Sequence, residues 1–379
     1  MIIKEKDIKY CFNVDWLSFS VKLENEDANL VCPDGYRLEL YDGNNIFKRR
    51  AILLDSIGRK VLTMLWKPHS CIIAPNICTV QVGNELLYSE EEDAAMKLMN
   101  KITPCTFNSF SRIDLAIDFE VDNRLMAIIR KLDNGSHYVQ GKQNGAKWWH
   151  EGEYKGIKQQ IPHCLNWGSS SSEIKVKLYN KSREQNLLLP NGVPDKPYIV
   201  EQWKWADFDT KSVWRLEFSL SSSGSLLWKN DYISWDMYFS SVWRYEVFCS
   251  LYNSRFVIRK KEGKKKGHKN NDKKILFLRL PKTTDKLRWV ETNLNIESKE
   301  SISAVRRIMK ELEKPYALCN EVVFTSLADT LTTMVRVGNL DYYFKRTTGY
   351  STEEYISNIY DSVGVGVVKP ELKPSMSWE

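Results

Sequence analysis

The stretch SRIDLAIDFE at residues 111–120 alternates, with all of its charged side chains at even positions. Its charged positions are Arg112, Asp114, Asp118 and Glu120, and its apolar positions are Ile113, Leu115, Ile117 and Phe119. Successive side chains of a β-strand point to opposite faces of a sheet, so this period of two predicts a half-buried strand with one charged face.

Two further stretches repeat this alternation. In IKVKLYNK at residues 174–181, one face carries Lys175, Lys177, Tyr179 and Lys181. In VWRLEFS at residues 213–219, the polar face carries Arg215, Glu217 and Ser219, and the apolar face carries Trp214, Leu216 and Phe218. Laid side by side, the three strands would form a surface able to hold a metal ion and to bind and attack a phosphate.

The chain has 379 residues, of which 42% are hydrophobic, so it suits one large globular domain or two ordinary ones. The net charge of +7 is concentrated in residues 259–274, RKKEGKKKGHKNNDKK. Such a run predicts a solvated loop or hairpin tip that suits a phosphate backbone, and a plain linker is the alternative. The expected DNA contacts are Lys260, Lys261, Lys264, Lys265, Lys266 and Lys269.

The eight cysteines form no CxxC pair and lack the spacing of a zinc site. The first ten residues lack the apolar core of a signal peptide, and no apolar run approaches the length of a membrane span. We therefore expect free thiols in a cytoplasmic protein with no membrane partner.

The chain divides into a strand-rich part and a helix-rich part. Strand-like pieces occur at residues 10–22, 36–42, 51–66 and 71–89, with breaks that include Gly58, Pro68, Pro75 and Gly83. Helices are expected at 90–99 and 122–132. Residues 138–172 are rich in Gly, Ser and Trp and lead into the tyrosine strand, and 182–205 form a connection. Mostly helical patterns follow at 225–258 and 275–361, including 302–313, 326–337 and 352–359. The sequence thus predicts an α+β protein, with an antiparallel-sheet catalytic region and flanking helices at 1–222, and a mainly helical DNA-binding or dimerisation region at 223–379.

Tyr179 is the candidate nucleophile. A tyrosine hydroxyl attacks more readily when a base, a cation or a metal favours the phenolate. Lys177 and Lys181 flank Tyr179 on its face, which predicts a lowered pKa for its phenol. A single tyrosine on a strand usually serves in packing, and a single acid is usually half of an ion pair. The prediction therefore depends on the combination of the tyrosine, lysines, arginines and carboxylates across the three strands.

Carboxylates and arginines on the other two strands complete the predicted site. Oxygen ligands suited to Mg²⁺ or Mn²⁺ come from Asp114, Asp118 and Glu217. Arg112 and Arg215 could clamp phosphate oxygens with paired hydrogen bonds. A metal there would polarise the phosphate for in-line attack.

At these residues the chain resembles the replication initiation factors of rolling-circle plasmids, a family that includes initiators of small staphylococcal plasmids and relaxases of some integrative conjugative elements. The matching pieces, in the family's order, are DWLSFS at 15–20, RIDLAIDF at 112–119, GSSSSEIKVKLYNKSREQ at 168–185 and WRLEFSL at 214–220. The most specific is the family's Y-[DN]-K-x-x-E setting, matched here by Tyr179, Asn180, Lys181 and Glu184. The R-x-D-x-x-x-D and R-x-E pieces match Arg112, Asp114, Asp118, Arg215 and Glu217, and nothing after about residue 225 is matched.

The resemblance implies that Tyr179 nicks one strand at an origin, which is single-stranded or extruded as a hairpin. The products are a 5′-phosphotyrosine link and a free 3′-OH, and a second transfer rejoins the strand. It implies Mg²⁺ or Mn²⁺ held by Asp114 and Glu217, with Asp118 next. Further candidates for site residues, ranked below these, are Glu120, Lys177 and Glu184. Glu184 could orient the tyrosine instead of binding the metal. It also implies a homodimer and a host replicative helicase as partner.

Several alternatives stay open. A conjugative relaxase would use the same chemistry, a non-catalytic DNA-binding regulator would use the lysine run and aromatic residues, and a structural protein would use the strand faces as ion-pair ladders. The histidines at 69, 137, 150, 163 and 268 lack the His-x-His pair of two-histidine relaxases, and Tyr179 lies too far from the C-terminus for a tyrosine recombinase. Metal-dependent nicking separates an enzyme from the regulator and the structural protein.

Overall fold

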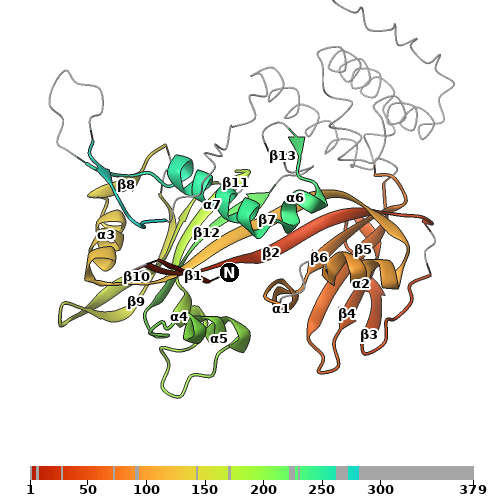
Figure 1. The fold of residues 1–379 in the computed structure, drawn as a ribbon, viewed down its shortest axis with the longest axis horizontal. Helices are drawn as coiled ribbons and strands as arrows, with labels where there is room; N and C mark the ends of the chain where they lie inside the picture. Colours follow the sequence, from red (N-terminus) through yellow and green to blue (C-terminus); the bar gives the residue numbers. More distant parts are fainter. Residues whose placement is uncertain are drawn as a thin grey trace, which may run out of the picture.

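The computed structural model describes residues 2–5, 8–26, 29–70, 73–89, 94–141, 144–169, 172–221, 227–228, 231–261 and 272–280. Within them, eleven strands form one antiparallel sheet in the order β3-β4-β5-β6-β2-β7-β12-β11-β10-β9, with β1 paired to β2 (Figure 1). The predicted α+β class with an antiparallel sheet and flanking helices is confirmed. The expected helices at 302–313, 326–337 and 352–359 lie outside the described residues.

The large sheet consists of β1 (Ile2–Glu5), β2 (Ile8–Leu23), β3 (Arg37–Asp42), β4 (Phe47–Leu54), β5 (Lys60–Pro68), β6 (Ile77–Val82), β7 (Cys105–Glu120), β9 (Asn144–Tyr154), β10 (Ile157–Trp167), β11 (Ile174–Asn180) and β12 (Val213–Ser221). A small sheet joins β8 (His137–Val139), β15 (Ile258–Lys260) and β16 (Lys274–Ile275), and β13 (Leu227–Trp228) pairs with β14 (Asp231–Tyr232). The helices are α1 (Asn84–Leu87), α2 (Ala94–Ile102), α3 (Asn123–Asp133), α4 (Lys181–Glu184), α5 (Pro197–Trp205), α6 (Trp235–Phe239) and α7 (Ser241–Arg255).

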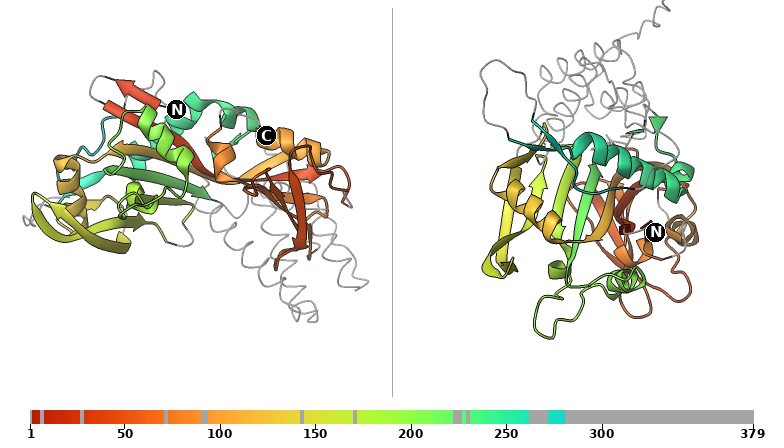
Figure 2. Two further views of the ribbon diagram at one scale, coloured as in Figure 1. Left: turned by 90° about the horizontal axis from the view of Figure 1, so that it is seen from below. Right: turned by 60° about the vertical axis from the view of Figure 1, so that its left-hand side comes forward.

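The long strands β2 and β7 connect two parts of the sheet. Figure 1 shows them running across the molecule, with β3 to β6 at one end and β9 to β12 at the other. Figure 2 shows the sheet bending between these ends. Both strands have 16 residues, and β2 pairs with β6 only over residues 18–22. Ser18 lies opposite Arg112 of β7 and Gln81 of β6, so the face that carries Arg112 continues across β2 onto β6.

The three alternating stretches become neighbouring strands, with β12 between β7 and β11. Glu217 lies opposite Lys177 on one side and Ala116 on the other. Arg215 lies opposite Tyr179 and Asp118 in the same way. Residues directly opposite in a ladder project from the same face, so the predicted shared charged face is confirmed.

The opposite face of these strands is the main hydrophobic core. Ile117, Leu216 and Phe218 are fully buried there, together with apolar residues of α2, α3 and α7. Phe248 of α7 meets the rings of Phe12 and Phe218 edge to face, at centroid distances of 5.7 and 5.1 Å. Burial of one such side chain contributes about 1.5–3 kcal/mol, which is why the apolar half of the alternation fixes the register.

Two helices expected from the sequence are present. The helix expected at 122–132 is α3, whose N-cap Asp122 accepts a hydrogen bond from the Leu125 amide at 2.7 Å. The helix expected at 90–99 is α2, which begins at Ala94 within the described residues and ends at Ile102. In the region 225–258, α6 and α7 confirm the helical expectation, apart from the two-residue strands β13 and β14.

Two segments contain elements that the sequence analysis did not predict. Residues 138–172, for which it predicted no strand, contain β9, β10 and most of β8. The β9–β10 hairpin turns at Lys155 and Gly156, both with positive φ (52° and 75°). The connection 182–205 contains α5. In the strand-like stretch 71–89, β6 occupies 77–82, between the expected breaks at Pro75 and Gly83, and α1 follows it. No residue from 146 to 154 of β9 is buried, and Trp148 and Trp149, on opposite faces, are 46% and 48% exposed, so no buried face marks the strand in the sequence.

The described residues after 222 pack on the same core as the sheet. Phe256, Ile258, Phe277 and Leu278 are each at most 2% exposed and belong to it. The proposed division between 1–222 and 223–379 stays a prediction, because residues 281–379 are outside the description.

The ends of the basic run pair as a hairpin, with Arg259 opposite Lys274, as the sequence led us to expect. Lys264, Lys265, Lys266 and Lys269 are outside the described residues. Six cysteines are described and all are free thiols, as expected. In the described part of the chain, no helix is long and apolar enough to cross a membrane.

Candidate active site

Tyr179 lies at the end of β11, where the chain passes directly into helix α4. The Asn180 side chain caps α4 by accepting from the Arg183 amide at 2.8 Å, which fixes the turn after the tyrosine. The Tyr179 hydroxyl donates to Glu217 Oε2 at 3.1 Å, and Lys181 Nζ donates to the same hydroxyl at 3.3 Å. The hydroxyl therefore lies between a carboxylate that can accept its proton and an ammonium that can stabilise its anion.

Glu217 is the central acid of this group. It is 3% exposed, and its Oε1 accepts from Lys177 Nζ at 3.0 Å. Burial raises the pKa of Glu217; Lys177 opposes this shift, and the charges of Asp15 and Asp114 add to it. We call Tyr179, Glu217, Lys177 and Lys181 the tyrosine cluster.

The expected lowering of the Tyr179 pKa is wrong. Burial raises the pKa of Tyr179 well above its ordinary value, and the Glu217 carboxylate raises it further. Lys177 binds Glu217 instead of the phenol, and burial lowers the pKa of Lys181. A phenol held protonated needs a base for attack, and Glu217 is in hydrogen-bond contact with it.

Glu184 lies on α4, the helix that follows the tyrosine strand. Its Oε2 is 2.6 Å from Lys181 Nζ, and the Lys181 side chain is fully buried. Burial alone would raise the pKa of Glu184, but the charge and hydrogen bond of Lys181, together with the charge of Arg215 and a hydrogen bond from Gln185, lower it on balance. Glu184 thus reaches Tyr179 through Lys181, a geometry that suits an orienting residue better than a metal ligand.

A second group on the same face surrounds Arg215, which is fully buried. Its guanidinium donates to both oxygens of Asp118, at 2.5 and 2.7 Å, and also to Asp15 Oδ1 and, at 2.9 Å, to the Tyr88 hydroxyl. The Trp203 indole of α5 donates to Asp118 Oδ2 at 2.9 Å, and Tyr88 donates to Asp15 at 3.0 Å. We call Arg215, Asp118, Asp15, Tyr88 and Trp203 the arginine cluster.

The arginine cluster has most of its hydrogen bonds satisfied internally. Burial alone would raise the pKa of Asp15, but the charges of Arg215 and Lys181 hold it well below the usual range. Arg215 would have to leave two carboxylates to clamp a phosphate, and Asp118 would have to leave Arg215 to bind a metal. The geometry therefore fits a supporting role for Arg215 and Asp118, and their predicted catalytic and ligand roles stay predictions.

Arg112 and Asp114 form a more accessible pair. Arg112 Nε and Nη2 donate to the two Asp114 oxygens at 2.9 and 2.6 Å, and the guanidinium lies 4.4 Å from the Trp16 ring centroid. The Arg112 side chain is 34% exposed, against 4% for Asp114. Arg112 can thus reach an incoming phosphate while it remains in contact with its carboxylate.

The other predicted residues lie outside these groups. Glu120 Oε1 accepts from the Asp209 amide at 2.7 Å at the end of β7. Lys260 and Lys261 are exposed at the start of the basic run. They could contact DNA but do not reach the tyrosine cluster through any contact of the described residues.

The metal prediction fits this arrangement poorly. Asp114, Asp118 and Glu217 are each paired with a cation, namely Arg112, Arg215 and Lys177. Among the described residues, no three His, Cys, Asp or Glu side chains are grouped so that they could hold a metal ion. Binding of Mg²⁺ or Mn²⁺ would require at least one ion pair to open, so we derive no chemical step through a metal.

Sequence reasoning missed three members of the arginine cluster. Asp15 lies in a bulge of β2, between Val14 opposite Leu115 and Trp16 opposite Asp114, and the bulge hides it from an alternation analysis. Its only signal is the DWLSFS piece itself. Tyr88 and Trp203 come from segments distant in sequence, and no local pattern marks their contacts.

Comparison with protein-family models and with curated proteins finds no match. Among solved structures, the chain is similar to one in the class of rolling-circle replication initiators. That structure is the rolling circle replication initiator protein from Geobacillus stearothermophilus, at 15% identity and a TM-score of 0.41, over 71% of this chain and 93% of that chain. At these values the likeness assigns no activity and no residue role to this chain.

Proposed function

We propose that this chain nicks and rejoins one DNA strand through a phosphotyrosine intermediate at Tyr179, as a rolling-circle replication initiator does. The observation that supports this most is the Tyr179 hydroxyl held between Glu217 Oε2 at 3.1 Å and Lys181 Nζ at 3.3 Å. A nucleophile in contact with a base and a cation is the arrangement that covalent catalysis requires. A conjugative relaxase would use the same groups.

The proposed reaction begins with proton transfer from the Tyr179 hydroxyl to Glu217 as the phenol oxygen attacks the phosphorus. Lys181 stabilises the negative charge that develops on the phenol oxygen. The bond between phosphorus and the 3′ oxygen breaks, and this oxygen takes the proton from Glu217 to become a 3′-OH. The 5′ phosphate remains esterified to Tyr179. Rejoining is the same sequence in reverse, so no external energy source is needed.

Arg112 is proposed to position the phosphate. Its guanidinium is partly exposed beside Asp114, and it is fixed by its contact with Trp16. Planar guanidinium groups bind phosphate oxygens in pairs. Lys177 would attract the strand and keep Glu217 ionised, since its charge lowers the pKa of Glu217.

The rest of the polar face supports a DNA partner. Across β2, β6 and β5, half-buried polar side chains lie opposite one another, as Ser18 with Gln81 and Gln81 with Thr63 do. The face continues to Arg50 of β4, which lies opposite Tyr41. The polar side chains on this face and the cation Arg50 at its far end suit a nucleic-acid backbone, where each neutralised phosphate releases counterions.

Three predictions come from the resemblance alone: a replication origin as the DNA, a host helicase as partner, and a homodimer. The requirement for Mg²⁺ or Mn²⁺ is a prediction that comes from the carboxylates of the three strands and from the resemblance. Asp114 and Glu217 are the residues we would test first as metal ligands. Binding of Mn²⁺, followed by electron paramagnetic resonance, should weaken in Asp114→Asn and in Glu217→Gln, and persist in Glu120→Gln as the control.

The test is a cleavage assay on supercoiled plasmid that carries the chain's own replicon, with Mg²⁺ or Mn²⁺ present. We expect nicked circles with protein attached at the 5′ end, and their loss by about 10³-fold or more in Tyr179→Phe with DNA affinity nearly unchanged. Intact plasmid under every metal condition, with DNA still bound, would favour the non-catalytic regulator. Full cleavage by Tyr179→Phe would move the nucleophile elsewhere.

A further inference from the structure

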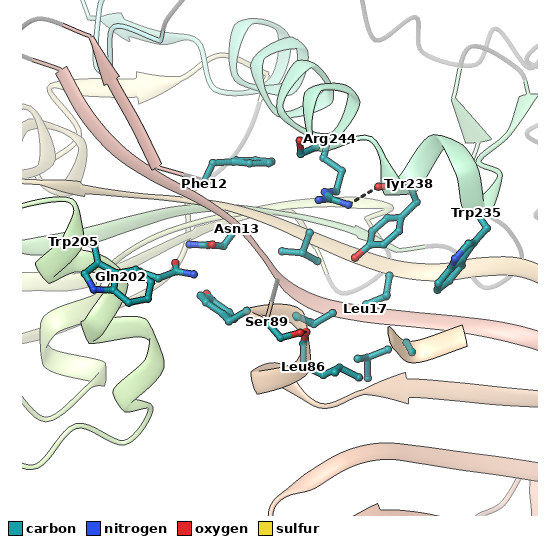
Figure 3. Close-up of a pocket in the computed structure, with 16 residues that line it drawn as sticks. Phe12, Asn13, Leu17, Leu86, Ser89, Gln202, Trp205, Trp235, Tyr238 and Arg244 are labelled. Atoms are coloured by element: carbon teal, nitrogen blue, oxygen red, sulfur yellow. Dashed lines mark hydrogen bonds between the residues drawn. The ribbon is translucent and has the colours of Figure 1, made fainter. Parts of the chain in front are cut away.

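A pocket lies where strand β2 has no strand neighbour on one side. β1 pairs with residues 8–11 of β2 and β6 pairs with residues 18–22, so in the described part of the chain the β2 edge between them is open. A cavity of about 460 Å³ lies at this gap. Figure 3 shows it between β2, the α1 segment, α5, and the α6–α7 segment.

Several polar groups of the pocket have no protein partner among the described residues. Asn13 is 8% exposed and lines the cavity, and its side-chain amide makes no hydrogen bond to any described residue. The Gln202 amide of α5 and the Tyr238 hydroxyl of α6 are likewise without a partner in that part of the chain. Tyr238 is only 5% exposed. Their polar atoms open onto the cavity and remain available to a ligand that can donate and accept hydrogen bonds.

Flat aromatic surfaces lie at both ends of the pocket. Trp205 of α5 is 66% exposed at one end, an unusual exposure for so large an apolar side chain. At the other end Trp235 of α6 stacks on Phe110, with ring centroids 5.4 Å apart. In Figure 3, Trp205 and Gln202 lie on the side opposite Trp235 and Tyr238. A flat ligand would have a ring to stack on and amides to meet its edge.

A cation lies beside these groups. Arg244 of α7 lines the cavity, donates to the Tyr238 carbonyl at 2.6 Å and lies 5.0 Å from the Tyr238 ring centroid. The pocket thus combines a guanidinium for a phosphate, aromatic rings for stacking, and amides that carry both a donor and an acceptor. Asn and Gln side chains of this kind read the edges of nucleobases.

From this combination we infer that the pocket binds one unpaired nucleobase of a DNA strand. The inference extends the proposed function, since the base would belong to the strand presented to Tyr179. The pocket shares Tyr88 with the arginine cluster, where the Tyr88 hydroxyl contacts Arg215 and Asp15. Asn13 lies opposite Ala116, and Ala116 opposite Glu217, so Asn13 and Glu217 are two strand spacings apart, roughly 10 Å.

This placement gives the pocket a function at the nick. A base held there would keep its strand in a fixed register beside the tyrosine cluster, and an unpaired base is the only kind that a pocket can enclose. A fully paired duplex would not fill the pocket. The pocket would therefore favour extruded or single-stranded DNA.

The test is a scan with abasic residues in the Tyr179→Phe protein, which binds without cleaving. Oligonucleotides tiled along both strands of the chain's replicon identify the tightest binder, and each of its positions is then replaced by an abasic residue. We expect one position at which removal of the base weakens binding about tenfold. In Asn13→Ala, and separately in Gln202→Ala, the same replacement should change affinity less than twofold. Gln160→Ala, an exposed amide on β10, is the matched control and should retain the tenfold effect.

The outcomes separate this inference from the proposed function. Base binding in the pocket would be refuted if an abasic replacement still weakened binding about tenfold in both Asn13→Ala and Gln202→Ala. It would also be refuted if no abasic replacement weakened binding in the scan. Each of these results is compatible with full nicking in the plasmid assay. Conversely, an abasic effect that depends on Asn13 without any nicking by the unmodified chain would keep the base site and refute the chemistry. Gln202→Ala covers the case in which Asn13→Ala fails to fold.

Discussion

The tyrosine cluster and the arginine cluster lie side by side on one face of the sheet, yet their charges are satisfied differently. Arg215 is fully buried, and Asp118, Asp15, Tyr88 and Trp203 surround its guanidinium or its partners. Tyr179 is only partly buried, and its hydroxyl contacts one base and one ammonium. Arg215 and Tyr179 are direct neighbours across β11 and β12.

The difference comes from what covers each part of the face. Helix α5 and the segment after α1 lie over the arginine cluster and supply Trp203 and Tyr88. The Lys177 side chain of the tyrosine cluster is 39% exposed, so solvent or a ligand can reach it. Buried ion pairs with complete hydrogen bonding hold structure, whereas a protonated nucleophile beside an ionisable base can react.

After loss of the nucleophile itself, replacing Glu217 by Gln should have the largest effect on the reaction. Removal of the base that contacts Tyr179 is expected to slow nicking by about 10²–10⁴-fold, while plasmid binding stays nearly unchanged. Single-turnover cleavage of supercoiled plasmid measures this. Glu184→Gln, which acts through Lys181, should have a smaller effect, and equal rate reductions in the two variants would contradict the assignment of Glu217 as the base.

Replacing Arg215 by Met should have the largest effect on stability. It leaves Asp118 and Asp15 buried without their countercharge, which should cost about 3–5 kcal/mol of unfolding free energy. Arg112→Met is the comparison variant. It removes one partly exposed cation from one carboxylate, Asp114, and solvent can enter where the Arg112 side chain was, so the loss should be smaller than in Arg215→Met. Urea denaturation of both variants gives the comparison. Equal destabilisation would mean that the two clusters do not differ as described.

Replacing Lys177 by Met should shift the pH dependence of nicking. Glu217 must be ionised to accept a proton, so activity falls as pH drops through its pKa, which burial raises above the ordinary value. The Lys177 charge lowers this pKa, so its removal should move the acid limb of the pH–rate profile to higher pH. Lys177→Arg should leave the limb near its original position. A limb that stays in place or moves to lower pH in Lys177→Met would contradict this account.

The smallest effect is expected at the basic run. Lys260→Gln with Lys261→Gln should reduce the salt dependence of DNA binding by about 0.7–0.9 in log–log slope for each phosphate that is no longer neutralised. Nicking of bound plasmid should be unaffected. The control pair Lys101→Gln and Lys204→Gln changes two exposed lysines outside the run. An unchanged salt slope in the variant with Lys260→Gln and Lys261→Gln would mean that the described part of the run is a plain linker that does not bind DNA.

The sequence predicted the strands of the site because their apolar halves are buried. Leu115, Leu216 and Leu178 are each at most 1% exposed, and this burial produces the alternation that the sequence displays. Strand β9 escaped prediction because neither of its faces is fully buried. The site itself was predicted only in part. Alternation gives the face of Arg215 and Tyr179, but it cannot show that α5 covers one and not the other, since that depends on contacts between distant segments.

The most direct test of the central claim is to locate the covalent bond to DNA. The protein is incubated with plasmid or a nickable single strand, the DNA is digested to a nucleotide stub, and tryptic peptides are analysed by mass spectrometry. We expect the nucleotide on the peptide that contains Tyr179, with cleavage sites at Lys177 and Lys181. An adduct on Tyr154 or Tyr138, or a nicked product with no protein attached, would contradict the account.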